Sequence, residues 1–263
     1  MSRPATVYTA ACLSLPGDHL YRRFRVMSDL AGRQTLTDLL WLSVQRESPT
    51  DLQRRVLDDI ATVSSVGDPR IWPLKVARIV ASEGSAIRGL LAGQLMLDGA
   101  LIGPYTCRHS AELLLGVQAS QDAGAELPGI ISDAISKRAR LPGFGVAFRS
   151  VDERVAVLTA CLARRGSQNE RCYYRLFEAI ADVVRDQCNL EPNFGIAMAA
   201  ALLDLGLSPS EIGAISVALL NHLFLANAFE AAADQPSAYR RLPPEAVEYV
   251  GPGPRRSPRC GRP

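Results

Sequence analysis

Aromatic residues and net charge are both scarce in this sequence. Only 6% of the 263 residues are aromatic although 48% are hydrophobic, so aliphatic side chains must build most of the core. Alanine and leucine are abundant, and because both favour helices they predict an all-α protein. The 29 basic and 27 acidic residues leave a net charge of +2, and this balance argues against a nucleic-acid partner.

Closely spaced cysteines, a signal sequence and a long apolar run are also lacking. None of the six cysteines has the spacing of a metal or redox motif, so we expect reduced thiols and no bound metal. The first 20 residues lack the apolar core of a secretory signal. No 18-residue stretch looks apolar enough to cross a bilayer, because polar residues interrupt even the best candidate, residues 211–233. We therefore expect a cytoplasmic protein without a membrane partner.

Helical periodicity and capping residues run through most of the chain. Thr50 is the expected N-cap of one helix, and Ser208 with Pro209 and Glu211 forms the capping box of another. We find no β-alternation and no internal repeat. Small residues between 84 and 98 indicate close helix packing, either in the core or at a dimer interface. The predicted helices cover residues 36–46, 51–63, 73–82, 84–98, 108–120, 130–139, 151–164, 170–188, 195–205 and 209 to about 233.

Three segments in the second half carry a recognisable pattern. They read LPGFGVAFRSVDER at 141–154, EPNFGIAMAAALLDL at 191–205 and YRRLPPEAVEYVGP at 239–252. In this order they resemble the C-terminal half of the citrate synthase family, and in length the chain is most similar to its short branch, the citryl-CoA lyases. A weaker likeness in the first half rests on VARIVAS at 76–82 and on a Gly-Pro turn at Gly103-Pro104.

The resemblance implies an all-α citrate synthase-like fold and a set of ligand-contacting residues. The coenzyme A contacts would be Gly143, Phe144, Gly145 and Arg149, and the substrate contacts would be Arg154, Asn193 and Arg241. Each charged or polar position has a plainer alternative. Arg154 could pair with Asp152 or Glu153, Arg149 could be a solvated surface charge, and Asn193 could cap the helix that follows it.

Two positions depart from the family pattern where its acid–base groups stand. The family has His after the Pro-Gly-Phe-Gly turn and Asp in an Asn-x-Asp motif, whereas this chain has Val146 and Gly195. The chain also has no Arg or Lys from Ser210 to Tyr239, where the family carries a substrate-binding Arg. Because a positioned acid or base contributes roughly 10²–10⁴-fold to rate, we predict that ordinary citrate synthase activity is lost.

Replacement acid–base groups have to come from elsewhere in the chain. We predict Asp68, His109 and His222 as catalytic candidates, and we also consider Cys107 and Glu230. Cys107 and His109 would form a thiolate pair only if the backbone between them were extended. His222 lies on an apolar helix, where a packed, hydrogen-bonded role is the alternative.

The resemblance also suggests how the chain is divided. We predict a large helical domain from residues 35–104 and 201–250 and a small helical domain from residues 105–200. Residues 1–34 form a poorly defined N-terminal segment, and residues 251–263, rich in Gly, Pro and Arg, form a disordered tail.

Two classes of function fit these residues. The first is an enzyme that acts on an acyl-CoA or a small (poly)carboxylate with altered chemistry, such as C–C bond formation or cleavage or thioester hydrolysis. The second is a non-catalytic protein that binds a metabolite or pairs with an active paralogue as a heterodimer. In either class we expect no tightly bound cofactor, a coenzyme A thioester as candidate substrate, and a homodimer unless the paralogue is the partner.

Overall fold

The computed structural model describes residues 6–99, 102–137, 140–166, 171–234, 244–246 and 248–253. Within these ranges the protein is almost entirely helical, which confirms the predicted all-α class. The α-helices are α1 (Leu36–Gln45), α2 (Asp51–Val63), α3 (Trp72–Ala81), α4 (Ala86–Leu95), α5 (Gly103–Asp122), α6 (Leu127–Lys137), α7 (Glu153–Arg165), α8 (Cys172–Cys188), α9 (Phe194–Asp204), α10 (Pro209–Leu219) and α11 (Asn221–Asp234).

Local capping chemistry sets several helix starts. The Thr50 and Ser208 side chains accept from the backbone N–H three residues on, and Gln53 and Glu211 complete the two capping boxes. Both predicted caps are therefore confirmed. Thr35 caps α1 in the same way.

A small antiparallel sheet precedes the helices, and the sequence analysis did not predict it. Strands β1 (Cys12–Ser14), β2 (His19–Tyr21) and β3 (Phe24–Arg25) pair in that order, and a π-helical turn (Val26–Leu30) follows. The Tyr21 hydroxyl donates to the Leu39 carbonyl, and the Arg22 guanidinium donates to the Ser43 carbonyl, which ties the sheet to α1. Strands of two or three residues are too short to show alternation.

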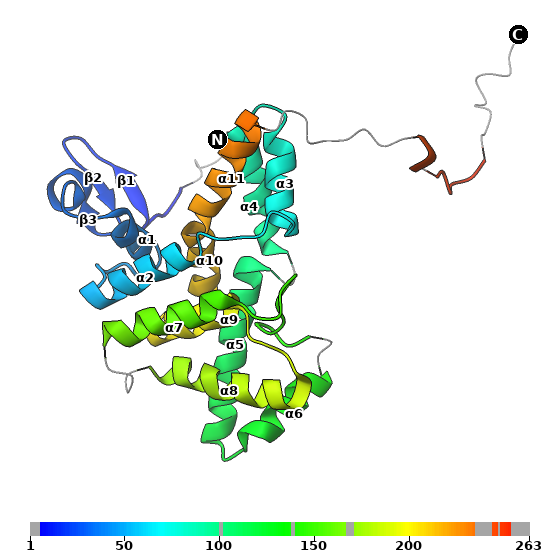
Figure 1. The fold of residues 1–263 in the computed structure, drawn as a ribbon. Coiled ribbons are helices and arrows are strands. Elements are labelled where there is room, and N and C mark those ends of the chain that lie inside the picture. Colours follow the sequence, from blue (N-terminus) through cyan, green and yellow to red (C-terminus); the bar gives the residue numbers. More distant parts are fainter. Residues whose placement is uncertain are drawn as a thin grey trace, which may run out of the picture.

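Helix α9 lies at the centre of the main core. Its residues from Phe194 to Leu203 are buried except Gly195, so this helix is apolar on every side, as a fully enclosed helix must be. Helices α5, α8, α7 and α10 pack around it. Helix α5 runs lengthwise through the molecule, from the α3–α4–α11 group at one end to α6 and α8 at the other (Figure 1).

Helices α3, α4 and α11 form a second, tightly packed group. A Cβ at Gly93 would lie 2.7 Å from the Phe224 ring, and one at Gly89 would lie 2.5 Å from the Ala77 carbonyl oxygen. These glycines therefore permit the close helix approach that the small residues of 84–98 predict. On the inner face of α3, the Arg78 guanidinium bonds Asn227 and Glu230 of α11.

The last apolar stretch departs from two expectations. The predicted single helix from residue 209 to 233 is divided at Leu220 into α10 and α11. Within the described residues, Pro209–Ala233 is also long and apolar enough to cross a membrane, with a mean hydropathy of 1.7, so the expectation that no stretch reaches this threshold was wrong. In this fold the stretch packs against α5, α3 and α4, as core helices do.

Candidate functional site

The amino ends of three helices meet at one cavity. Helices α5, α7 and α9 begin there, at Gly103, Glu153 and Phe194. The cavity, which we call the central cleft, encloses about 210 Å³. Its polar side is formed by Thr106, Arg149, Asp152, Arg154 and Asn193, and its apolar side includes Leu74, Leu97, Met198, Leu223 and Phe224. A helix amino end carries roughly half a positive charge and attracts anions, and at α7 and α9 the Asp152 carboxylate already accepts from that end.

The turn at Pro142–Gly145 is fixed to the segment before α9. The Gly145 N–H donates to the Glu191 carbonyl at 2.8 Å, and the Asn193 N–H donates to the Gly143 carbonyl at 2.9 Å. The Asn193 side chain accepts from the Gly195 N–H and donates to the Gly145 carbonyl, at 2.9 and 3.1 Å. Asn193 therefore has the capping role that the sequence offered as its alternative, and it also lines the central cleft.

Glycine is required at two positions of this arrangement. Gly143 has a φ of +84°, and a Cβ there would overlap Ile196 and lie 2.6 Å from the Ser110 Oγ. A Cβ at Gly195 would lie 2.9 Å from the Thr106 Cγ2 and 3.0 Å from the Asn193 Oδ1. The space that an Asp would need at position 195 is thus filled by Thr106.

A buried ion pair stands at the start of α7. The Asp152 carboxylate accepts from the Arg154 Nε and NH2 groups at 2.8 and 2.7 Å, and from the Phe194 N–H at 2.9 Å. Burial alone would raise the pKa of Asp152, but these hydrogen bonds and the Arg154 charge outweigh it and leave that pKa below its ordinary value. The two-pronged face of Arg154 is therefore already occupied by a protein carboxylate.

Arg154 keeps some capacity for a ligand. Its NH1 group donates to the Val66 carbonyl at 3.3 Å, and its guanidinium lies 5.0 Å from the centre of the Phe194 ring. A ligand carboxylate that approaches from the cleft would meet single N–H groups, because Asp152 already binds the Nε and NH2 groups together. The sequence alternative of an Arg154–Asp152 pair and the ligand role are compatible.

A charged rim surrounds the mouth of the central cleft. Arg149 lines the cleft and pairs with Glu153. Asp68 is bound by Arg70, whose guanidinium also lies over the Phe148 ring at 4.3 Å. Hydrogen bonds from Arg70 lower the pKa of Asp68 to about 2. Asp68 is thus a carboxylate at neutral pH, and it is not part of the cleft lining.

His109 lines a second cavity on the other side of the Pro142–Ala147 segment. This second cleft has a volume of about 680 Å³ and shares Thr106, Gly145, Val146, Ala147 and Asn193 with the central cleft. The His109 Nδ1 lies 3.3 Å from the Glu112 Oε2, a distance for an ion pair but not an aligned hydrogen bond. The Tyr105 ring stands 3.9 Å from the His109 ring, centre to centre.

The remaining candidates are separated from each other. Cys107 is buried and faces the central cleft while His109 faces the second one, so the two do not form a pair. Burial raises the pKa of the Cys107 thiol to about 12. His222 is exposed and bonded to the Ser65 Oγ at 3.0 Å, and Glu230 is paired with Arg78. Arg241 lies outside the described residues.

Thr106 is the site residue that sequence reasoning missed. It lines both clefts and touches the space above Gly195. The sequence signal that could have revealed it is the Gly103-Pro104 turn, which marks a helix start. A polar side chain in the first turn of that helix lies close to any cavity at the helix end. Val146 and Gly195 do line the central cleft, so neither position supplies a side-chain proton to it.

The fold has well-matched relatives among solved structures. Citryl-CoA lyase from Hydrogenobacter thermophilus superposes with a TM-score of 0.77 at 19% identity, over 97% of this chain and 98% of that one. ATP citrate lyase from Methanothrix soehngenii, solved with citrate and coenzyme A, gives 0.76 at 17% identity, over 96% of this chain but 43% of that longer one. Citrate synthase from Thermoplasma acidophilum gives 0.63 at 14% identity, over 85% and 59%.

These likenesses define the fold as the citrate synthase and citryl-CoA lyase fold. They exist at the level of structure alone: no protein-family model and no curated protein sequence matches this chain. At this degree of identity the shared fold does not fix the reaction, which has to be argued from the residues of the two clefts.

Proposed function

We propose that the protein is a citrate synthase-like enzyme that binds an acyl-CoA or a small (poly)carboxylate in the central cleft and acts on it with altered acid–base chemistry. The observation that carries this proposal is the meeting of three helix amino ends with Arg149 and Arg154 at one cavity. Ligands of this class are anionic, and such a cavity attracts them. Citrate and coenzyme A are bound in the ATP citrate lyase relative, which supports the same ligand class here.

The proposed chemistry relies on His109 rather than on positions 146 and 195. His109 lines the second cleft, and its Nδ1 lies 3.3 Å from the Oε2 of Glu112, whose Oε1 accepts from Arg108. Because the two clefts share one wall, a ligand that extends past Val146 would bring its reacting end toward His109. A positioned histidine serves C–C bond cleavage or thioester hydrolysis as general acid or base.

Calorimetric titration with coenzyme A, acetyl-CoA, oxaloacetate and citrate tests the binding half of the proposal. Arg149→Gln should weaken the bound member of this set by roughly ten- to hundredfold, the usual effect of removing a charged hydrogen bond. Arg164→Gln is the control, because Arg164 lies in the last turn of α7, outside the cleft lining, and bonds the Cys161 Sγ. Absence of binding by all four ligands would contradict the proposal.

Turnover assays test the altered chemistry. Acetyl-CoA with oxaloacetate should give no detectable citrate, since Val146 and Gly195 hold no transferable proton. A rate near about one per second, ordinary for an enzyme, would contradict it. If a bound thioester or citryl compound is consumed, His109→Gln should abolish that consumption while leaving binding intact.

A non-catalytic role is the second candidate, and one observation favours it. Asp68 is held as a carboxylate by Arg70, and His222 is exposed and bonded to Ser65, so two of the three predicted catalytic residues line neither the central nor the second cleft. A metabolite-binding protein, or the partner of an active paralogue, would bind the ligand and convert none of the thioester, citryl and carboxylate compounds tested. Binding that survives without turnover would select this alternative.

The proposed assembly is a homodimer through α4 and α11. These helices pack side by side, with the Gln94 amide bonded to Asn221 at 2.7 Å. Their outer surface carries a stripe of exposed apolar side chains: Ile87, Leu91, Leu95, Leu225 and Phe229. Exposed apolar surface of this kind marks interfaces. A cytoplasmic location and the absence of a tightly bound cofactor stay predictions.

A further inference from the structure

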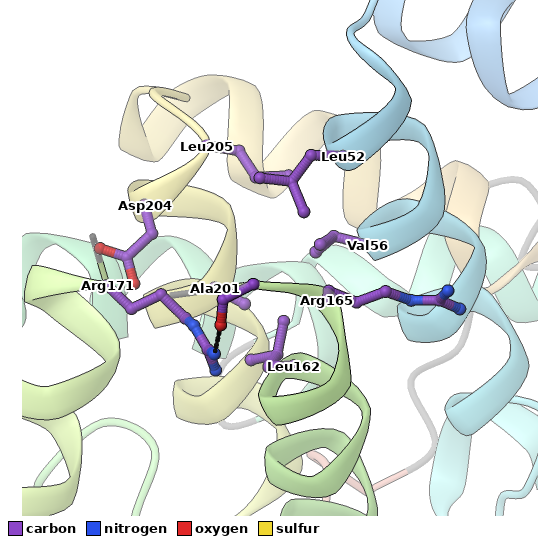
Figure 2. Close-up of a pocket in the computed structure, with 9 residues that line it drawn as sticks. Leu52, Val56, Leu162, Arg165, Arg171, Ala201, Asp204 and Leu205 are labelled. Atoms are coloured by element: carbon purple, nitrogen blue, oxygen red, sulfur yellow. Dashed lines mark hydrogen bonds between the residues drawn. The ribbon is translucent and has the colours of Figure 1, made fainter. Parts of the chain in front are cut away.

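A separate apolar pocket lies at the opposite ends of the helices that begin at the central cleft. Helices α7 and α9 start at that cleft, and their carboxyl-terminal halves supply Leu162, Ala201 and Leu205 to the pocket, while α2 supplies Leu52 and Val56. Figure 2 shows these side chains facing one another around an open space. None of the pocket residues lines the central or the second cleft.

The pocket is large enough for a short hydrocarbon chain. It encloses about 110 Å³, and its exposed lining is mainly apolar. A cavity of about 150 Å³ accommodates the six carbons of benzene, so this smaller pocket holds roughly four carbons.

Two arginines lie at the mouth of the pocket, and their guanidinium groups differ in the acceptors that they bond. Arg165 points away toward α2, where Asp59 accepts from its Nε and NH2 groups at 2.8 and 2.9 Å (Figure 2). Arg171 reaches across the mouth, and among the described residues its side chain donates to one neutral acceptor, the Gly166 carbonyl, at 2.8 Å. No carboxylate in the described part of the chain accepts a hydrogen bond from Arg171, although its charge also acts on the Asp204 and Glu178 carboxylates.

One carboxylate, that of Asp204, lines the same pocket as Arg171. Asp204 accepts from the backbone N–H groups of Tyr173 and Tyr174 at 2.8 and 2.9 Å, so it holds the start of α8 and occupies the donors of that helix end. Burial raises the pKa of Asp204, which shows how poorly this carboxylate is solvated. A ligand anion at the mouth would therefore bind the guanidinium rather than the helix end.

We propose that this pocket binds a short aliphatic monocarboxylate, with the chain between Leu52, Leu162 and Leu205 and the carboxylate on Arg171. A carboxylate on a guanidinium forms two parallel charge-assisted hydrogen bonds, and the apolar wall supplies the remaining affinity. This inference is independent of the function proposed for the central cleft, because the two cavities share no residue.

Pentanoate is the probe, and its neutral analogue 1-pentanol separates the two contributions. Titration followed by leucine-methyl NMR should show saturable pentanoate binding that shifts the methyl signals of Leu52, Leu162 and Leu205. Pentanol should bind at the same place roughly ten- to hundredfold more weakly, since it lacks the charged partner. If pentanoate binding does not saturate up to about 10 mM, the affinity is too weak for a specific site and the proposal is overturned. Equal affinities for pentanoate and pentanol would also overturn it.

Three variants locate the site. Leu52→Trp, at a position 42% exposed, should close the pocket and abolish binding without disturbing the core. Arg171→Gln should remove the preference for pentanoate over pentanol. Arg175→Gln, which deletes the same charge from α8 outside the pocket lining, should leave both affinities unchanged. Pentanoate binding retained by Leu52→Trp, or lost instead in Arg149→Gln of the central cleft, would overturn the assignment.

Discussion

Asp152 joins two helix starts through a single carboxylate. It caps α7, accepts from the first N–H of α9 and holds the Arg154 fork, with a side chain that is 1% exposed. Removing one partner of a buried ion pair leaves the other charge without compensation. We therefore expect Arg154→Ala to lower the free energy of unfolding by about 3–5 kcal/mol, measured by urea denaturation.

A variant that removes both charges of the pair is the control for the Arg154→Ala prediction. In Asp152→Asn/Arg154→Ala no buried charge is left alone, so the loss should be smaller than the sum of the two single losses, with a coupling within roughly 0.5–3 kcal/mol. Additive losses would mean that the pair is not coupled. This stability effect is also the reason that Arg149→Gln, and not Arg154→Ala, is the suitable variant for ligand binding.

Two half-buried aspartates predict how stability depends on pH. Hydrogen bonds from the backbone N–H of Met27 and other donors lower the pKa of Asp18 to about 2, and Arg70 lowers that of Asp68 to about 2. An unfolded Asp titrates near about 3.9, so between those values the unfolded chain binds more protons. Stability should be complete above about pH 4 and fall as the pH drops toward 2.

Acid denaturation of Asp68→Asn tests whether stability falls with pH in this direction. The variant should lose stability less steeply than the wild type below about pH 4, because one group with a depressed pKa has been removed. Asp133→Asn, on the exposed face of α6, is the comparison. An unchanged slope in Asp68→Asn would show that the Arg70 pairing does not persist in solution.

At the scale of the helix, capping residues were the most reliable sequence signal. Thr50 and Ser208 fix the starts of α2 and α10 to the residue, because a cap is a local hydrogen-bond pattern that needs no tertiary contact. Signals of other kinds were weaker. Helix α5 begins at Gly103 rather than near 108, because Pro104, Thr106 and Cys107 are buried and extend it toward the core. Helix α6 begins inside the predicted loop at Leu127, and burial does not explain this start, since residues 127–130 are not buried.

Ser208→Ala tests the capping box directly. The Ser208 Oγ and N–H both donate to Glu211, at 2.7 and 2.8 Å, and the hydroxyl also accepts from the Glu211 N–H. The substitution should lower the free energy of unfolding by about 0.5–2 kcal/mol, seen as a lower midpoint in thermal unfolding. Ser210→Ala removes only the 3.3 Å contact between the Ser210 and Ser208 hydroxyls and leaves the capping box in place, so it should have a smaller effect. Equal effects would contradict the capping role.

At the scale of the whole molecule, the central cleft is assembled from segments far apart in the chain. Thr106, Val146, Arg154 and Gly195 come from three helices and a loop that the motifs correctly marked as related. The motifs could not reveal that Asp152 occupies the Arg154 fork, or that Thr106 fills the space above Gly195, because both depend on side chains brought together only by folding. The division into two domains stays a prediction.

The exposed apolar stripe on α4 and α11 yields the last prediction. Leu91 is 55% exposed and Phe229 is 62% exposed, in the middle of a surface that no other part of the described chain covers. If this surface joins two copies, the wild type should have twice the 28.4 kDa chain mass in light scattering after gel filtration. A charge placed at its centre should separate the copies, because an unpaired carboxylate cannot be buried in an apolar contact.

Leu91→Glu should therefore shift the mass toward 28.4 kDa. Leu36→Glu is the matched control, since Leu36 is 74% exposed on α1, away from the stripe, and should leave the dimer intact. Repeating the measurement over a range around about 50 μM separates a weak dimer from none, because association depends on concentration. A wild type that stays monomeric throughout, or a dimer that Leu91→Glu leaves unchanged, would show that the stripe is not the interface between copies.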